Sequence, residues 1–144
     1  MLALVLVLVL STAAGLLWRA ASGRVRAVRP AAPVRESAAD RPAAEVLAGL
    51  GVDPAAAAVT LVQFSSAFCQ PCRATRQILG QVATQLPAVR HVEVDAESHL
   101  DAVRELSILR TPTVLVVDRA GRVVRRASGQ PRKADVIAAV APFL

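Results

Sequence analysis

The sequence predicts an α/β sandwich, in which helices cover both faces of a central mixed sheet. Residues 59–64 form a β-branched and mostly apolar run, which is typical of a strand buried on both faces. Strand and helix patterns alternate after this run, as expected for strands that are joined by helices. Residues 113–117 and 122–126 are two strand patterns on either side of a short turn with Gly121, which predicts an antiparallel hairpin.

Turn and capping residues set the expected limits of the helices. Asp40 can cap the first helix of the domain, and Gly51 and Pro54 end it. Pro71 opens the second helix, because a proline in the first turn loses no hydrogen bond, and Pro87 stops it. We expect helices at residues 41–50, 71–86, 97–106 and 132–143, and strands at residues 59–64, 89–95, 113–117 and 122–126.

An apolar segment precedes the expected domain. From Leu2 to Trp18 no side chain is charged, and this length of helix would span about 25 Å, slightly less than a hydrocarbon core of roughly 30 Å. Arg19 can extend its head group to the interface, where an indole such as Trp18 also prefers to lie. We therefore predict a single N-terminal transmembrane helix at residues 1–21. The alternative is a cleaved signal peptide, although no basic side chain precedes the run and no clear cleavage site follows it.

The excess of positive charge lies between this apolar segment and the domain. The chain has a formal net charge of +6, and residues 19–41 carry six Arg against Glu36 and Asp40. We interpret residues 22–41, which are rich in Arg, Pro and Ala, as a tether, and residues 42–144 as the folded domain. Because the basic residues follow the apolar segment and none precedes it, the positive-inside rule favours a domain that faces the cytoplasm, with an extracytoplasmic domain as the alternative.

The charge of the domain does not indicate nucleic-acid binding. Residues 42–144 carry eleven basic and nine acidic residues, and aromatic residues make up only 3% of the chain. Domains that bind nucleic acids use a basic recognition element or a set of stacking aromatic side chains, and this sequence has neither. We therefore expect no nucleic-acid partner.

Two cysteines stand at a predicted strand-to-helix turn. Cys69 and Cys72 are separated by Gln70 and Pro71 at the start of a helix, and the sequence Thr-Pro-Thr at residues 111–113 begins a strand about forty residues later. With these motifs, residues 42–144 resemble a thioredoxin domain. The resemblance implies a thioredoxin-like three-layer sandwich with a central mixed sheet, and it implies that the protein is a thiol–disulfide oxidoreductase.

The resemblance also implies a role for each residue of the site. Cys69 lies just before the helix, where unpaired N–H groups and the helix dipole favour a thiolate, so it would attack a substrate disulfide. Cys72 lies one turn further on and would resolve the mixed disulfide. Pro112 resembles the cis-proline of the family, and the backbone of Thr111 would pair with substrate polypeptide. Further candidates for substrate contact are Phe68 and Pro71.

Two alternatives concern the use of the cysteine pair. A zinc site would need His91 and His99, but seven residues lie between them instead of the usual three to five or so. We therefore expect no metal and no other cofactor. A redox-inactive thioredoxin-like module that binds partners through the Pro112 surface is the alternative function. As partners of an active enzyme we expect protein disulfides and a dithiol electron donor, and we expect the protein to be a monomer.

The sequence departs from the family pattern beneath the cysteines. Six residues before the first cysteine the family commonly buries an Asp that helps to deprotonate the resolving thiol. This chain has Gln63 there, and a neutral amide cannot act as that base. The Lys that often neighbours this Asp is replaced by His91, which we expect to be partly buried. Arg125 and Arg126 fall on an alternating strand, and we interpret them as exposed side chains that protect a sheet edge.

Overall fold

In the part of the chain that the structure describes, five strands form a single mixed sheet in the order β1-β5-β4-β2-β3. The computed structural model describes residues 2–21, 25–27 and 40–144 of the chain. The strands are β1 (Val25–Ala27), β2 (Val59–Ser65), β3 (Val89–Asp95), β4 (Thr113–Asp118) and β5 (Val123–Ser128). The helices are α1 (Leu2–Ala21), α2 (Asp40–Gly49), α3 (Gln70–Gln85), α4 (Leu100–Glu105) and α5 (Lys133–Val140), with short 3-10 turns η1 (Pro54–Ala56) and η2 (Ala141–Phe143).

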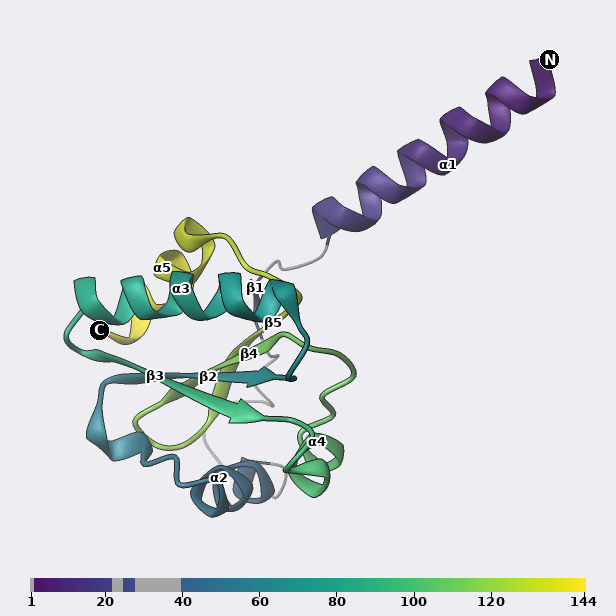
Figure 1. Cartoon of the computed structure of the whole chain (residues 1–144). Helices are drawn as coiled ribbons and strands as arrows, with labels where there is room; N and C mark the ends of the chain where they lie inside the picture. Colours follow the sequence, from purple (N-terminus) through teal and green to yellow (C-terminus); the bar gives the residue numbers. More distant parts are fainter. Residues whose placement is uncertain (1, 22–24, 28–39) are drawn as a thin grey trace.

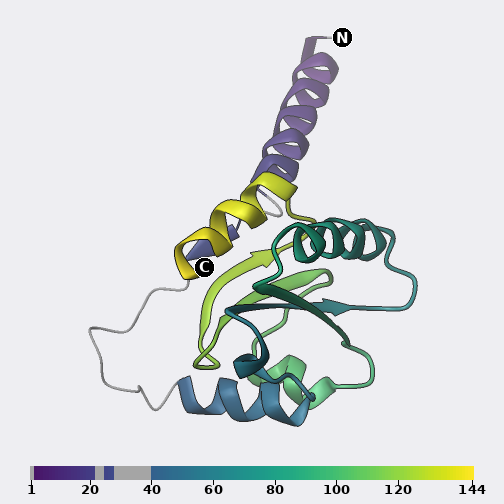
Figure 2. The same ribbon diagram turned by 90° about the vertical axis from the view of Figure 1, so that its left-hand side faces the viewer.

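The helices cover the two faces of the sheet in pairs. Figure 1 shows α3 and α5 on one face and α2 and α4 on the other, and the turned view in Figure 2 shows the same three layers. Each face has its own apolar core: Leu79 and Val136 belong to the core under α3 and α5, and Leu47 and Leu106 to the core under α2 and α4. The predicted three-layer sandwich is therefore confirmed.

Strand pairing follows the predicted pattern around β2. β2 pairs in parallel with β3, and α3 makes the connection between them. On its other edge β2 pairs antiparallel with β4, which forms a hairpin with β5. The parallel pair and the antiparallel hairpin that the sequence predicted are both present, and the sheet is mixed.

One strand was not predicted. β1 lies in the segment interpreted as a tether, and it pairs antiparallel with β5, with Val25 opposite Ala127. The other predicted tether residues before α2, 22–24 and 28–39, lie outside the described residues. Because β1 covers β5, the prediction that Arg125 and Arg126 protect a free sheet edge is wrong. Both side chains are only partly exposed, and they have specific partners that are described below.

The apolar N-terminal segment forms helix α1, as predicted. Its described side chains, residues 4–17, are exposed, and the helix projects away from the sheet in Figures 1 and 2. Among the described residues, however, no helix has both the length and the apolar character needed to cross a membrane. The structure therefore does not support the predicted transmembrane span.

Two helices are shorter than predicted because local side chains and turns compete with them. The Asp95 carboxylate accepts hydrogen bonds from the Glu97 N–H at 3.0 Å and from the Ser98 hydroxyl at 2.5 Å. This turn occupies the residues that we expected to open the helix, so α4 begins at Leu100. The last helix ends at Val140, and the chain continues as the 3-10 turn η2.

The β4–β5 turn needs its glycine. Gly121 has φ +79°, in the left-handed region, and its N–H donates to the Asp118 carbonyl at 2.9 Å. The Asp118 carboxylate accepts the N–H groups of Ala120 and Arg122, each at 3.0 Å, and so holds the turn from inside. A Cβ at Gly121 would lie 3.3 Å from the Cβ of Ala44 on α2. The turn is thus limited both by its backbone conformation and by the helix packed against it.

We predict that Gly121→Ala lowers the free energy of unfolding by about 1–2 kcal/mol, because alanine is strained at positive φ. Urea unfolding of the purified protein, followed by circular dichroism, measures the difference. Gly80→Ala is the matched control, since Gly80 lies in α3 and no atom outside its own stretch of helix lies within 4 Å of the added Cβ. This control should raise stability by roughly 0.5–1 kcal/mol. Equal effects of the two substitutions would contradict the prediction.

Candidate active site

The two cysteines form a disulfide where β2 passes into α3. Cys69 is the N-cap residue of α3, and Cys72 lies in its first turn. Their Cα atoms are 5.2 Å apart and the S–S bond is 2.04 Å long. Cys72 is 1% exposed, whereas Cys69 is only partly buried. Of the two sulfurs, that of Cys69 is therefore the one that a second molecule can approach.

The start of α3 places a hydrogen-bond donor at the sulfur of Cys69. Its Sγ accepts the N–H of Cys72 at 3.1 Å, as a capping side chain does. In the reduced form the same N–H can donate to a thiolate, and the helix dipole acts in the same direction. Pro71 stands in the first turn, where its missing N–H costs no hydrogen bond. Both predictions about the position of the pair, Cys69 before the helix and Cys72 one turn inward, are confirmed.

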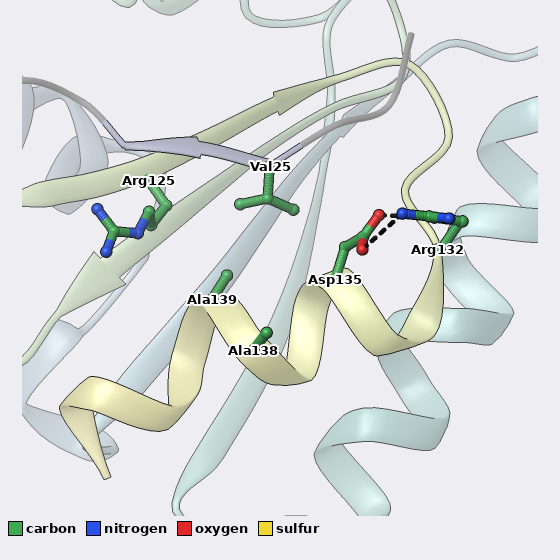
Figure 3. Close-up of a pocket in the computed structure, with 6 residues that line it drawn as sticks. All are labelled: Val25, Arg125, Arg132, Asp135, Ala138 and Ala139. Carbon is green, nitrogen blue, oxygen red and sulfur yellow. Dashed lines mark hydrogen bonds and ion pairs between the residues drawn. The ribbon is translucent and has the colours of Figure 1, made fainter. Parts of the chain in front are cut away.

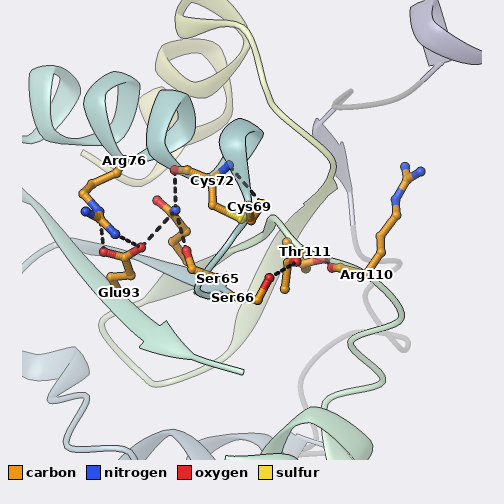
Figure 4. The surroundings of a disulfide bond; sticks show 10 residues. Ser65, Ser66, Cys69, Cys72, Arg76, Glu93, Arg110 and Thr111 are labelled. Atoms are coloured by element: carbon orange, nitrogen blue, oxygen red, sulfur yellow. Dashed lines mark hydrogen bonds and ion pairs between the residues drawn. A yellow bond between two sulfur atoms is a disulfide. The ribbon is translucent and has the colours of Figure 1, made fainter. Parts of the chain in front are cut away.

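A second loop lies against the cysteine loop. The Thr111–Pro112 peptide bond is cis, as the resemblance implied. The hydroxyl groups of Ser66 and Thr111 are hydrogen-bonded at 3.0 Å, which joins the loop before Cys69 to the loop before Pro112 (Figure 4). The structure thus brings the cysteine loop together with Thr111, about forty residues further along the chain, and with Pro112, to which Thr111 is joined by the cis bond.

Exposed apolar side chains occur in both loops. Phe68, directly before Cys69, is 96% exposed, and Leu109, three residues before Pro112, is 93% exposed. Single exposed apolar side chains are common on protein surfaces, but these two lie in the loops that carry Cys69 and Pro112 and are free to contact another molecule. Phe68 was predicted as a substrate contact, but Leu109 was not. The signal for Leu109 was an apolar residue in a loop, outside any strand or helix pattern.

Gln63 is the centre of a buried polar cluster beneath the disulfide. Its side chain is fully buried on β2. The amide nitrogen donates to the Cys72 carbonyl at 2.9 Å and to the Ser65 hydroxyl at 2.8 Å. The amide oxygen lies 3.2 Å from Nε2 of His91. Since that oxygen can only accept, His91 must donate its Nε2 proton, which defines the tautomer of a neutral imidazole.

His91 is held in its neutral form by the protein interior. Burial lowers the pKa of His91, the charge of Glu93 acts in the opposite direction, and the charge of Arg76 lowers the pKa further. The prediction of a partly buried His91 is confirmed. His99, by contrast, is exposed and lies just before α4, on a different element from this cluster. Within the described part of the chain, no group of three or more His, Cys, Asp or Glu side chains could hold a metal ion.

An ion pair borders the cluster on the side of β3. Arg76 of α3 contacts both oxygens of Glu93, with Nε–Oε2 at 2.6 Å and a second contact to Oε1 at 2.8 Å (Figure 4). Burial alone would raise the pKa of Glu93, but the hydrogen bonds from Arg76 and Ser65 and the charge of Arg76 lower it overall. This pair was not singled out from the sequence, because its partners are 17 residues apart on different elements.

A shallow pocket lies away from these loops. It is lined by Val25, Arg125, Arg132, Asp135, Ala138 and Ala139, from β1, β5 and α5 with the residue before it (Figure 3). In this pocket Nε and Nη2 of Arg132 donate to the two oxygens of the Asp135 carboxylate, at 2.8 Å and 3.0 Å. None of the lining residues belongs to the cysteine loop or the Pro112 loop, so we assign the chemistry to the disulfide.

Comparison with known proteins agrees with this site. The family model of thioredoxin matches residues 53–142, and this match covers more than half of the chain. The chain belongs to the thioredoxin family. The thioredoxin of Chlamydia trachomatis serovar D is 29% identical over 85 residues, which cover 59% of this chain and 82% of that protein.

Solved structures extend the comparison to the fold. Chloroplastic thioredoxin z is 26% identical, with a TM-score of 0.58 over 67% of this chain and 88% of that one. A mutant thioredoxin from Halobacterium salinarum NRC-1 is 15% identical, with a TM-score of 0.59 over 63% of this chain and 79% of that one. A thioredoxin fold with a Cys-x-x-Cys pair supports thiol–disulfide oxidoreductase activity in general terms.

We predict that the buried His91 makes this thioredoxin domain less stable in mild acid. Below its ordinary pKa of 6.5, His91 in the unfolded chain binds a proton that the folded protein excludes until the pH reaches its lower native pKa. The free energy of unfolding therefore carries no penalty from His91 above about pH 6.5. Below that pH it falls by at most about 1.4 kcal/mol per pH unit. His91→Gln keeps a donor for Gln63 and should remove most of this loss between pH 7 and pH 5.

Urea unfolding at several pH values measures the effect, with His99→Gln as the matched control at the exposed histidine. The lowered pKa of Glu93 adds a separate loss of stability, which begins only below its ordinary value of 4.5. If the free energy of unfolding of both His91→Gln and His99→Gln varies with pH as it does in the unchanged protein, the burial of His91 does not destabilise the protein in acid.

Proposed function

We propose that this protein is a membrane-attached thiol–disulfide oxidoreductase that exchanges disulfides with protein substrates. The observation that carries the proposal is the pairing of a partly exposed Cys69 at the start of α3 with a buried Cys72. Attack requires a sulfur that is accessible and stabilised as a thiolate, and resolution requires a second sulfur within bonding distance. The cis-Pro112 loop beside the pair offers backbone to which an extended substrate can bind.

In the first step of this proposal the Cys69 thiolate attacks one sulfur of a substrate disulfide. A bond forms between Cys69 and that sulfur, the substrate S–S bond breaks, and the other substrate sulfur leaves as a thiolate. The N–H of Cys72, which lies 3.1 Å from the Cys69 sulfur in the oxidised form, stabilises the thiolate before attack. The product of this step is a mixed disulfide on Cys69.

In the second step Cys72 attacks the sulfur of Cys69. The Cys69–Cys72 disulfide forms, the mixed disulfide breaks, and the substrate leaves as a thiol after it takes up the proton that Cys72 gives up. Because the buried neighbour Gln63 is a neutral amide, no protein base takes this proton at that position, and it reaches the leaving sulfur directly or through water. A dithiol donor then returns the pair to its reduced form by the same exchange.

Membrane attachment through α1 is a separate part of the proposal. The described side chains of α1 are mostly Leu and Val, and each of the large ones is at least 59% exposed. A helix with so much exposed apolar surface needs a partner, and a lipid bilayer is the apolar phase that accepts it. The arginines that follow the helix favour the cytoplasmic leaflet. We therefore propose that the domain faces the cytoplasm, where a reducing pool would keep the cysteines as a dithiol.

We predict that the protein catalyses the reduction of insulin by dithiothreitol and that Cys69→Ser lowers the rate to that of dithiothreitol alone, because no attacking sulfur remains. Cys72→Ser should accumulate mixed disulfides with substrate through Cys69. Mass mapping of the trapped complexes identifies the bonded cysteine. Trapping mainly through Cys72 in Cys69→Ser would reverse the two roles. An inactive protein that still binds partners through the Pro112 surface would support a redox-inactive binding module instead.

We predict that the chain sediments with membranes and that a membrane-impermeant maleimide labels it only after the cells are permeabilised. Cys69 and Cys72 are the only cysteines of the chain, so after gentle reduction the label reports the side of the domain. A chain without residues 2–21 should move to the soluble fraction, and the double variant Cys69→Ser, Cys72→Ser should remain unlabelled. Labelling of intact cells would place the domain outside and oppose the reducing direction.

A further inference from the structure

Arg126 on β5 reaches across to the loop that carries Pro112. Its guanidinium donates to the carbonyl oxygens of Leu106 at 2.6 Å and of Ser107 at 3.0 Å, about twenty residues away in the sequence. Within the described residues its hydrogen-bond partners are these two backbone carbonyls, not a carboxylate. A fork of two donors held on adjacent carbonyls fixes both distance and direction, which a single contact does not.

The carbonyls that Arg126 binds lie where α4 ends. The N–H of Ser107 donates to the Arg104 carbonyl at 3.1 Å, and that of Ile108 donates to the Val103 carbonyl at 2.8 Å. These two bonds are those of a Schellman motif, in which the residue after the helix adopts the left-handed conformation. That residue is usually glycine, but here it is Ser107 with φ +51°. The conformation is unfavourable for serine, so contacts from outside the loop must help to hold it.

Further contacts join β5 to the rest of the loop. The Arg110 guanidinium donates to the Ser128 carbonyl at 2.9 Å, and the Gly129 N–H donates to the Pro112 carbonyl at 2.7 Å. Residues 106–112 are therefore held by β5 and the residue after it at both ends. Arg126 provides the contact at the α4 end, before Thr111, whose hydroxyl contacts Ser66 of the cysteine loop.

We propose that Arg126 is a positioning residue for substrate binding, which it serves by holding residues 106–112 in the orientation that presents Thr111 and Pro112 beside Cys69. This inference rests on the proposed oxidoreductase function. Arg126 touches neither sulfur and takes no part in the exchange of bonds. Its loss should therefore weaken the binding of a polypeptide substrate, which needs the loop, and leave the reactivity of the disulfide itself unchanged.

The neighbouring Arg125 is a matched control. Residues 125 and 126 point to opposite faces of the sheet: Arg126 pairs opposite Leu115 of the α2 and α4 core, and Arg125 pairs opposite Val116 of the α3 and α5 core. The Arg125 guanidinium lies 6.0 Å from the centre of the Phe143 ring, at the end of the chain. The same substitution can thus be made at two neighbouring arginines of one strand, of which Arg126 contacts the loop and Arg125 lies on the opposite face of the sheet.

The test compares Arg126→Gln and Arg126→Lys with Arg125→Gln and Arg125→Lys in the full chain in detergent micelles. Steady-state reduction of insulin should show KM raised about three- to tenfold for the Arg126 variants with kcat little changed, because displacing a binding element by a fraction of an ångström weakens positioning. Reduction of a small aromatic disulfide, which does not need the loop, should stay within about twofold of the unchanged protein. The Arg125 variants should match the unchanged protein on both substrates.

Hydrogen exchange provides a second readout that does not depend on activity. The amides of Ser107 and Ile108 should exchange about tenfold faster in Arg126→Lys than in Arg125→Lys, because their bonds to α4 depend on the loop conformation. Faster exchange without any insulin reduction by the unchanged protein would refute the proposed function but leave the positioning role intact. An unchanged KM for insulin in a protein that is active, or equal loss on both substrates, would overturn the inference. Arg126→Lys keeps the charge and the apolar part of the side chain. If Arg126→Gln does not fold, the KM and the hydrogen exchange of Arg126→Lys test the inference in its place.

Discussion

The structure depends on the burial of β2 between two other strands. All seven residues of this strand are buried, and it pairs with β3 on one edge and with β4 on the other. A parallel partner cannot be reached by a tight turn, so the chain must cross over the sheet as a helix. The N-terminus of α3 therefore stands at the carboxyl end of β2, and Cys69 caps it. The same requirement that buries the strand thus places the reactive sulfur at a helix N-terminus.

The polar cluster beneath the disulfide is stable because every group of the Gln63 amide has a partner. A buried amide without partners would cost about 1–3 kcal/mol for each unsatisfied group. Here its two donors and its acceptor oxygen join three elements: β2, the first turn of α3 through the Cys72 carbonyl, and β3 through His91. The amide holds the Cys72 carbonyl by a hydrogen bond, but unlike a buried carboxylate it carries no charge and does not titrate. The orientation of Cys72 therefore does not depend on the protonation of residue 63.

The parts of the fold that depend on local pattern could be predicted from the sequence. The strands at the centre of the sheet, helix α3 and the pair Cys69 and Cys72 follow from runs and motifs within a few residues of one another. Pro112 lies about forty residues away, and only the resemblance to the family placed it beside the cysteines. The wrong predictions concern residues whose structure is determined by contacts with residues far away in the sequence. β1 has only three residues and forms a strand because the edge of β5 is available to it. Arg126 was assigned to solvent, because nothing in its own strand indicates that two carbonyls at the end of α4 lie within its reach.

The two sides of the active site are held by different interactions. On the cysteine side, the disulfide is held by the cap at the start of α3 and by the Gln63 amide, which comes from β2. On the proline side, the loop of residues 106–112 is fixed by β5 and the residue after it, through Arg126 at one end and Gly129 at the other. The hydroxyl pair of Ser66 and Thr111 joins the two sides directly. β4 lies between the strands that carry these contacts, so β5 reaches the cysteine side only indirectly, through the loop of residues 106–112 and the Ser66–Thr111 hydroxyl pair. In the role that we propose for it, Arg126 therefore acts first on the proline side of the site, and on the cysteine side only through that hydroxyl pair.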